Sequence, residues 1–492
     1  MHYHHRTLLR HRFTENLMPY RLTLLCCILL TGCATKLAEP ERRWLAGDHH
    51  IHSRFSVGWE QTDPPKPILG GDAIYSIPQN AEMARKFGLD WIVATDHGGP
   101  NHSRINLEQA YPELLASRKA FPDVIQFQGL ELNTPGADHS SIIVPHTQDE
   151  AEHLHEYESR FDKLEPWPAD PSRDDEALML EALKFANSLP EKPVVIAHHP
   201  SRSAPALGEY GITSPAELRA WNDAAPEVAV GMEGAPGHQA AVFSKQGEKT
   251  NYPAWVFARG AYGRGHPTLG GFDQMTARLG GFWDSMLAEG RRWWITANSD
   301  SHIHYTEGGI DFWPGEYSKT YVHAIKEHAD ILDGIRNGRV FVVTGDLISE
   351  LYVTVSQDSA AADIGGELEI NPDLPVSVAI RMKDPARPNA AGRQPAVARV
   401  DLIVGELTGP ASHPHQDTHQ HVSVVERFTA DSWVADGDYI VMRTQLKIKQ
   451  GSYVRVRGTN SAAELEPAPD ETGEDPWTDL WFYANPVFVS TR

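Results

Sequence analysis

Residues 44–52 are Trp-Leu-Ala-Gly-Asp-His-His-Ile-His, an apolar run that ends in an aspartate and three histidines. Residues 91–97 (Trp-Ile-Val-Ala-Thr-Asp-His) and 293–302 (Trp-Trp-Ile-Thr-Ala-Asn-Ser-Asp-Ser-His) follow the same pattern, a strand-like run with Asp and His directly after it. Enzymes built on parallel barrels keep their chemistry at the carboxyl ends of the strands. The pattern therefore predicts a barrel whose mouth collects imidazoles and carboxylates, and a metal site is the simplest reason to gather them.

The chain divides into two parts with different patterns of apolar and polar residues. Up to residue 345, strand-like runs alternate with helical patterns, which indicates a parallel sheet and suits a barrel. Beyond about residue 350 the apolar runs are short and often alternate with polar residues, and Gly-, Pro- and Asp-rich loops separate them. We therefore expect an α/β barrel over 44–349 and a small all-β sandwich over 350–492. The strands predicted for the barrel are 44–51, 89–95, 124–132, 141–144, 193–197, 228–232, 293–297 and 320–325.

The N-terminus has the features of an export signal. A basic residue, Arg21, precedes the apolar run 22–30, which is too short to span a bilayer permanently. The Leu-Thr-Gly-Cys that ends at Cys33 resembles the bacterial lipobox, which implies cleavage before this cysteine and a lipid on its sulfur. We therefore expect residues 1–33 to be a signal region, with 1–17 an over-long start or a dispensable extension.

An exported lipoprotein, anchored in the outer membrane and facing the periplasm, follows from that interpretation. The alternative is an ordinary secreted protein with a chance cysteine. The chain has three cysteines, none later than position 33, so disulfides and thiolate zinc sites are excluded from the mature domains. The formal net charge of −22 argues against a nucleic-acid partner, which would require a basic patch.

Polar residues at several strand ends point to one site. His50 and His52 are two residues apart, so on a strand they project to the same face. Other predicted strands end in Glu131 and in the pair His198-His199. Burying this many polar groups in a barrel mouth is costly unless metals or other polar groups satisfy them. A single His-x-His pair is weak evidence, but five such strand ends favour a metal centre.

Five motifs, in order along the chain, carry a family resemblance. They are Asp-x-His-x-His-Ser (48–53), Thr-Asp-His (95–97), Gly-x-Glu (129–131), His-Pro (199–200) and Ser-Asp-Ser-His (299–302). Together they resemble the polymerase-and-histidinol-phosphatase (PHP) superfamily over residues 44–345. Segments 283–291, 335–339 and 481–486 look like its carbaryl-hydrolase-like branch. The resemblance implies a distorted (β/α)7 barrel that holds two or three divalent metal ions.

Carried over motif by motif, the resemblance also implies a ligand set. One ion would have His50, His52, Glu131 and Asp300; Glu131 would bridge to a second ion, and the remaining histidines would serve the second and third. Members of the family often have a further acidic or histidine ligand soon after the first pair, but residues 54–58 contain none. His198 is the alternative to His199. The implied metal ligands are His50, His52, His97, Glu131, His139, His199, Asp300 and His302.

Further candidates surround these ligands. Asp48 and Asp96 are interpreted as carboxylates that orient ligating imidazoles, with loop capping as the alternative. Arg202, which follows the His-Pro motif, is a candidate for binding a phosphate, as is Arg264. His238 is a candidate for protonating the leaving group. The alternative interpretation is that Arg202 and Arg264 are ordinary surface arginines and that His238 is an ordinary loop histidine. Glu233 shares the strand end before His238 and would face an imidazole or the substrate.

The chemistry expected from this set is hydrolysis. Paired ions lower the pKa of a shared water towards ~7, and the resulting hydroxide attacks phosphorus or a carbonyl carbon without a serine or cysteine nucleophile. Histidine and carboxylate ligands suit Zn, Mn or Fe and do not choose among them. We expect a phosphoesterase that acts on a small-molecule phosphoester. Hydrolysis of a carbamate, ester or amide is the alternative, and a non-catalytic metal- or ligand-binding lipoprotein is the second.

Overall fold

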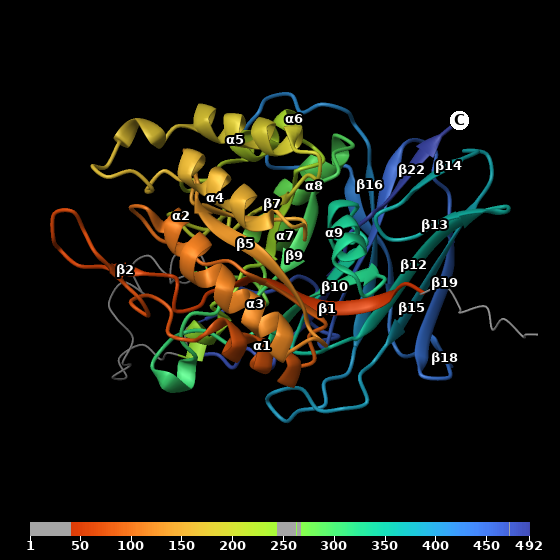
Figure 1. Ribbon diagram of the computed structural model, residues 1–492. Coiled ribbons are helices and arrows are strands. Elements are labelled where there is room, and N and C mark those ends of the chain that lie inside the picture. The colour runs from red at the N-terminus through yellow and green to blue at the C-terminus, as the bar shows by residue number, and fades with distance from the viewer. Residues whose placement is uncertain (1–40, 244–261, 263–266, 472) are drawn as a thin grey trace, which may run out of the picture. The chain divides into compact units, whose positions relative to one another are not determined.

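A fifteen-stranded mixed sheet runs through the protein (Figure 1). The computed structural model describes residues 41–492 apart from 244–261, 263–266 and 472, so the signal region with Cys33, and Arg264, lie outside the described residues. Glu41–Arg492 form one unit. Among the described helices, none has both the length and the apolar character required to cross a bilayer.

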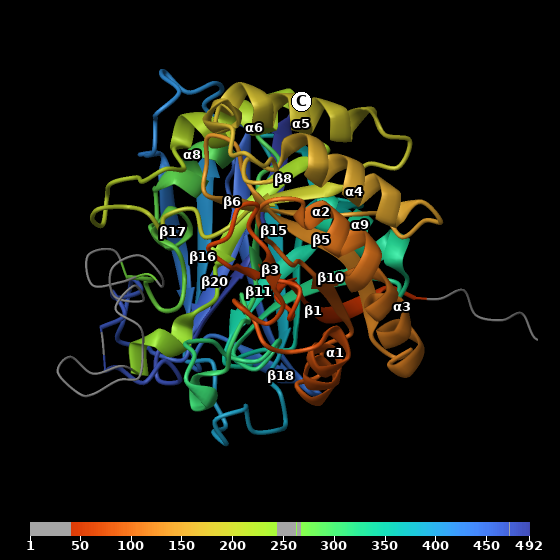
Figure 2. The ribbon, with the colours of Figure 1, turned by 60° about the vertical axis from the view of Figure 1, so that its left-hand side comes forward.

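Each strand predicted for the first part of the chain is present. Helices α1–α6 form an outer layer over these strands (Figures 1 and 2). The strands are β1 (Arg43–Ile51), β4 (Trp91–Ala94), β5 (Ile125–Asn133), β6 (His139–Ile143), β7 (Val194–Ala197), β8 (Ala229–Ala235), β9 (Trp294–Ala297), β10 (Ser318–Ala324) and β11 (Val340–Thr344). The helices are α1 (Ile77–Lys86), α2 (His102–Ile105), α3 (Tyr111–Ala120), α4 (Glu150–Phe161), α5 (Glu176–Ser188), α6 (Pro215–Ala224), α7 (Gln274–Ala277), α8 (Phe282–Ala288) and α9 (His328–Arg336).

The helices begin where local sequence favours a helix start. Ser76 precedes α1, and its side chain accepts a hydrogen bond from the backbone N–H of Gln79. Ser214 does the same for α6, and each of these helices has a proline in its first turn, where no N–H is missed. These caps fix where the connections from the strands end, and therefore how the loops at the site are closed.

The sheet is mixed rather than wholly parallel, which corrects the expectation of a parallel sheet. The pairs β1–β4, β4–β5, β7–β8 and β8–β9 are parallel, as predicted. Strand β6, however, pairs antiparallel with both of its neighbours, because a short turn over 134–138 returns the chain directly beside β5. Strand β10 is also antiparallel to β1.

The α/β class is confirmed, but the ladder of backbone hydrogen bonds does not close into a barrel. The sheet order ends at β9. Side chains join this last strand to β10, which lies in the middle of the sheet order: Thr320 Oγ1 on β10 accepts from Ala297 N (2.8 Å) and donates to Ala297 O (2.6 Å). Asn485 Oδ1 accepts from Ile295 N (2.9 Å). The edge of β9 is therefore satisfied without a strand partner.

The C-terminal region is all β, as expected from its sequence. Residues of both of its sheets share one hydrophobic cluster, which includes Val353, Val378, Val400 and Val454. Its strands are β12 (Glu350–Gln357), β13 (Ala360–Ala362), β14 (Glu367–Ile370), β15 (Val376–Lys383), β16 (Arg399–Glu406), β17 (Val422–Phe428), β18 (Val434–Asp436), β19 (Tyr439–Leu446), β20 (Ser452–Thr459), β21 (Trp481–Ala484) and β22 (Val487–Thr491).

The main sheet crosses the division expected near residue 349. Strand β21 pairs antiparallel with β11, with Val342 opposite Tyr483. Strands β20, β22 and β14 then extend the same sheet, while β13, β12, β15, β19 and β18 form a separate antiparallel one. The two parts of the chain therefore share hydrogen bonds and core, and their division into two domains stays a prediction.

Candidate metal centre

The strand ends bring all eight predicted metal ligands into one region. His50 lies on β1 and His52 directly after it, one ligand each lies on β5 and β6, and the others come from the loops after β4, β7 and β9. A cavity of about 250 Å³ opens above them. Its lining includes Asp72, His97, Glu131, His139, Arg202, His238, Asp300 and His302, together with Ile303 and the loop 308–311.

The first group of ligands is ordered by its outer hydrogen bonds. His50 Nδ1 lies 2.7 Å from Glu233 Oε1, and both side chains are fully buried. His52 Nδ1 lies 2.8 Å from Ser56 Oγ, whose hydroxyl donates to Asp96 Oδ1 at 2.9 Å. Because Ser56 already donates to a carboxylate, it accepts from His52 Nδ1–H. In the neutral rings the proton is on Nδ1, so Nε2 of both histidines carries an unprotonated lone pair.

These lone pairs face each other and two carboxylates. The two Nε2 atoms are 2.9 Å apart, and Asp300 Oδ1 lies 3.0 Å from that of His50 and 3.1 Å from that of His52. Glu131 contributes Oε1 at 3.2 Å from His50 and Oε2 at 3.3 Å from His52. Acceptors gathered around one point repel one another unless a cation lies among them.

Electrostatics agree with this conclusion. Burial lowers the pKa of His50, but Asp300, Glu131 and Glu233 outweigh it and raise the pKa well above its usual value. Burial and His302 hold the pKa of His52 well below its usual value. The carboxylates thus favour positive charge at a point where only one imidazole of the pair can take a proton. A divalent cation satisfies the same atoms with more charge.

The second group is centred on one oxygen of Glu131. This carboxyl is buried, and its pKa is held well below the usual value because His139 and His50 outweigh the effect of burial. A carboxylate shared between two sets of imidazoles suits a bridging ligand. Besides His50 Nε2, three imidazole nitrogens lie close to Oε1: His139 Nδ1 at 2.8 Å, His198 Nδ1 at 2.9 Å and His199 Nε2 at 3.2 Å. Both histidines of the 198–199 pair therefore reach the carboxylate.

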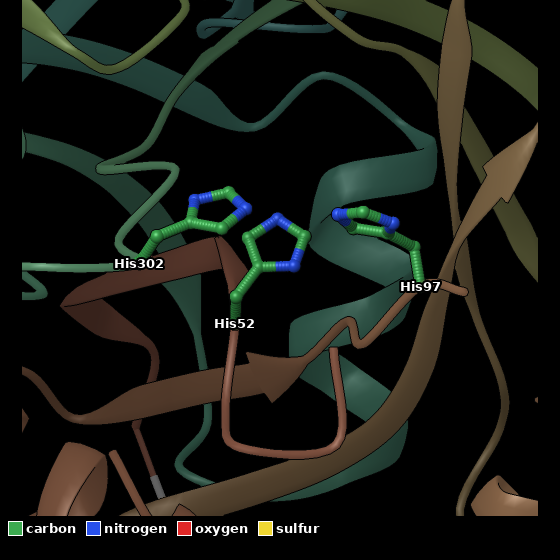
Figure 3. Close-up of side chains that lie close together, drawn as sticks. All are labelled: His52, His97 and His302. Carbon is green, nitrogen blue, oxygen red and sulfur yellow. The ribbon is translucent and has the colours of Figure 1, made fainter. Parts of the chain in front are cut away.

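The third group joins three segments that are far apart in sequence. His52, His97 and His302 each offer a ring nitrogen within 4.8 Å of the others. Figure 3 shows their rings side by side, with His52 between the other two. The rings of His52 and His302 are stacked, with centroids 3.8 Å apart.

Asp72 completes this third group and was not predicted from the sequence. Its Oδ2 lies 2.9 Å from His97 Nε2 and 3.4 Å from His302 Nε2. The chain leaves the site after Arg54, forms a hairpin from β2 (Gly58–Trp59) and β3 (Pro67–Ile68), and returns. At the base of the hairpin, Arg54 N donates to Tyr75 O (2.6 Å), which places Asp72 near the first ligand pair. No spacing in the sequence marks this residue.

The two aspartates expected to orient imidazoles bind backbone N–H groups and hydroxyls rather than the rings themselves. Asp48 accepts from the backbone N–H groups of His50 and Ser299, both at 3.1 Å, and so ties β1 to the loop after β9. Asp96 accepts from Ser53 N (2.6 Å) and reaches His52 only through the hydroxyl of Ser56. The carboxylate that contacts the His50 imidazole at Nδ1 is instead Glu233, whose role the sequence left open.

The two catalytic candidates lie beside the ligands, but each is already paired. Arg202 lines the cavity and makes two contacts with Asp138, Nη2 to Oδ1 at 2.8 Å and Nε to Oδ2 at 3.3 Å. His238 contacts Asp311 through Nδ1, and its Nε2 lies 2.5 Å from Asp300 Oδ2. With both ring nitrogens engaged, His238 holds Asp300 in place rather than presenting a free proton donor.

No family model matches this chain, and no curated protein is significantly similar to it. The metal centre is therefore inferred from the positions and the chemistry of its residues.

Proposed function

We propose that this protein is a metal-dependent hydrolase, a phosphoesterase with a PHP-type distorted (β/α)7 barrel. The observation that carries the proposal is the convergence of His50 Nε2, His52 Nε2, Asp300 Oδ1 and the Glu131 carboxylate around one point. Such a donor set, continued by further imidazoles on Glu131, suits two or three Zn, Mn or Fe ions. When bound, paired divalent ions acidify water and neutralise charge that develops on a substrate.

The other side chains that line the cavity could bind the phosphate and the leaving group of a phosphoester. The Arg202 guanidinium, which is paired with Asp138, lines the cavity and would bind a phosphate oxygen. Glu131 and Asp300 would be ligands of the ions, and His238 Nε2 contacts Asp300 Oδ2. The side chains of Ile303 and Ile310 form an apolar wall for the leaving group.

Hydrolysis of a carbamate, ester or amide is the second candidate. This reaction is favoured by the pairing of Arg202 with Asp138. The carboxylate of Asp138 already neutralises the Arg202 guanidinium, which therefore does not require a second negative charge on the substrate. The ligands would serve either reaction, so the two candidates differ in the substrate and not in the metal centre.

Elemental analysis tests the proposal. Protein that begins after Cys33, purified without chelators, is expected to hold two or more ions per chain. The double variant His50→Ala/His52→Ala should lose them, whereas the control His146→Ala, which removes a histidine paired with Glu150, should keep them. Fewer than one ion per chain after incubation with Mn, Fe or Zn would overturn the proposal. A screen of phosphomonoesters beside carbamate esters then separates the two reactions.

A further inference from the structure

A buried chain of hydrogen bonds lies beside the ligands and is not part of the proposed reaction. His49, which lies between Asp48 and His50 on β1, is fully buried. Its Nε2 lies 2.8 Å from Thr296 Oγ1 on β9, and its Nδ1 lies 3.1 Å from Ser141 Oγ on β6. Ser141 Oγ also contacts His198 Nε2, and His198 Nδ1 lies 2.9 Å from Glu131 Oε1. The chain thus ends on the carboxylate shared by the first two ligand groups.

This arrangement depends on an irregularity in β1. The register between β1 and β4 shifts between Asp48 and Ile51, so the strict alternation of side chains is interrupted there. His49 therefore reaches Ser141 and Thr296 across the sheet, although His50, the next residue, faces the ligands. A regular strand would have turned these neighbouring side chains to opposite faces.

The bonds that join His198, Ser141, His49 and Thr296 can run in either of two directions, because a neutral imidazole has one donor and one acceptor. In one order His198 Nε2–H donates to Ser141, Ser141 donates to His49 Nδ1, and His49 Nε2–H donates to Thr296. In the other order every bond runs the opposite way, and His198 Nδ1–H donates to Glu131. The competing acceptor for Ser141, the carbonyl of His49, is more distant at 3.5 Å.

We propose that His49, Ser141 and Thr296 are positioning residues that make His198 a metal ligand through Nδ1, alongside His199. The inference rests on the proposed metal centre. In the first proton order the lone pair of His198 Nδ1 points to Glu131, as a ligand requires, and His198, Ser141 and His49 each donate to the next residue of the chain. The second order serves the empty centre, where Nδ1–H donates to the carboxylate. Reversal of the hydrogen bonds in the network therefore exchanges one state for the other.

Two contacts favour this role over a metal ion between His49 and His198 themselves. Both ring nitrogens of His49 already have hydroxyl partners, so neither is free for a metal. The ring of His198 stacks on that of His50, with centroids 3.6 Å apart and planes 20° apart. The stack holds the plane of His198, and Ser141 holds its rotation within that plane. Nδ1 is thereby aimed at Glu131.

Chelator competition on the loaded protein tests the inference. Ser141→Ala is expected to weaken the binding of one ion by tenfold to about a hundredfold, the range known for partners of ligating histidines. The matched control is Ser140→Ala, the neighbouring buried residue on β6, whose hydroxyl contacts Thr134 instead and should leave affinity unchanged. Urea unfolding of the metal-free variants shows whether each is folded.

A second pair of variants keeps the test independent of Ser141. Thr296→Val removes the far end of the chain and should weaken the same ion, whereas Thr296→Ser retains the hydroxyl and should behave as wild type. Equal affinity in Ser141→Ala and wild type, or an equal loss in Ser140→Ala, would overturn the positioning role. Wild-type protein that binds no ions would instead overturn the metal centre, so the two failures are distinguishable.

Discussion

Asp72 supplies the acidic group that residues 54–58 do not. Its side chain is 43% exposed, and its partners are two histidines of the third ligand group. The hairpin between Arg54 and Asp72 therefore brings an acidic side chain from outside residues 54–58 to two histidines of the third group. The third group therefore consists of three imidazoles and the carboxylate of Asp72.

We predict that Asp72→Ala lowers the number of bound ions by one and leaves the ions of the Glu131 groups in place. Because the side chain is partly exposed, unfolding free energy should change by no more than about 0.5 kcal/mol. The control is Asp63→Ala, in the same hairpin, whose carboxylate contacts Trp167 and no histidine. Elemental analysis decides between them, and an unchanged ion count in Asp72→Ala would contradict the assignment.

His102 gives a pH dependence that is separate from the ligands. Its Nδ1 lies 2.5 Å from Glu158 Oε1 and its Nε2 lies 2.8 Å from Phe55 O, so both nitrogens face acceptors. Burial lowers the pKa of His102, but Glu158 outweighs burial, and the pKa is raised to about 9. The folded state thus binds this proton more tightly than the unfolded state, whose histidine titrates near 6.5.

The stabilisation from this pair is fully present below pH ~6.5 and is lost as the pH rises through about 9. It amounts to at most about 3 kcal/mol, since one pKa unit is worth about 1.4 kcal/mol. Urea unfolding of wild type should show a loss of stability between pH 6 and pH 9.5. His102→Gln should lack this part of the loss, and an identical pH slope in both proteins would refute the prediction.

At the scale of elements, β9 is the strand whose placement matters most. Asp300 and His302 follow it directly, yet it has a strand partner on one side only. On its other side, the hydroxyl of Thr320 and the amide of Asn485 take the places of a neighbouring strand. The curvature of the sheet and the position of two ligands therefore depend on a few side-chain hydrogen bonds.

Thr320→Val is predicted to lower the unfolding free energy by about 1–3 kcal/mol, because Ala297 N–H and C=O lose a buried partner. The same change should weaken metal binding, since the loop that carries Asp300 shifts with β9. Thr320→Ser keeps the hydroxyl and should restore both properties. Urea unfolding and chelator competition measure the two effects, and loss of stability with unchanged affinity would show that β9 does not control the site.

Across the whole molecule, the C-terminal strands complete the fold of the first part. Asp284 of α8 is fully buried, and both of its oxygens contact Arg455 of β20, Oδ1 at 2.9 Å from Nε and Oδ2 at 2.7 Å from Nη2. Tyr453 donates to Oδ1 as well, at 2.9 Å. Removing one partner of such a pair leaves a buried charge without compensation.

A chain that ends at Ser349 is therefore predicted not to fold. It would lose the β21 partner of β11, the Arg455 that pairs with Asp284, and more than half of the residues of the shared hydrophobic cluster. Full-length protein should unfold in urea in one transition followed alike by far-UV circular dichroism and tryptophan fluorescence. A soluble, cooperatively unfolding 41–349 fragment would show instead that the two parts are independent domains.

Local patterns in the sequence were sufficient for the strands and for most of the site. The runs 44–51, 89–95 and 293–297 form strands, because apolar runs followed by polar residues identify buried strands and their ends. The predicted histidines and acids lie together for the same reason, since the ends of neighbouring parallel strands meet at one edge. Such information is carried by residues that are adjacent in the chain.

The folded arrangement was needed wherever contacts join distant segments. Asp72 reaches the third group only because a hairpin closes on Arg54, and His198 is aimed at Glu131 by Ser141 and by the ring of His50. The reversal of β6 and the side-chain edge of β9 likewise have no local signature. Each depends on which segments the compact chain brings within hydrogen-bond distance, and spacing along the sequence does not encode that.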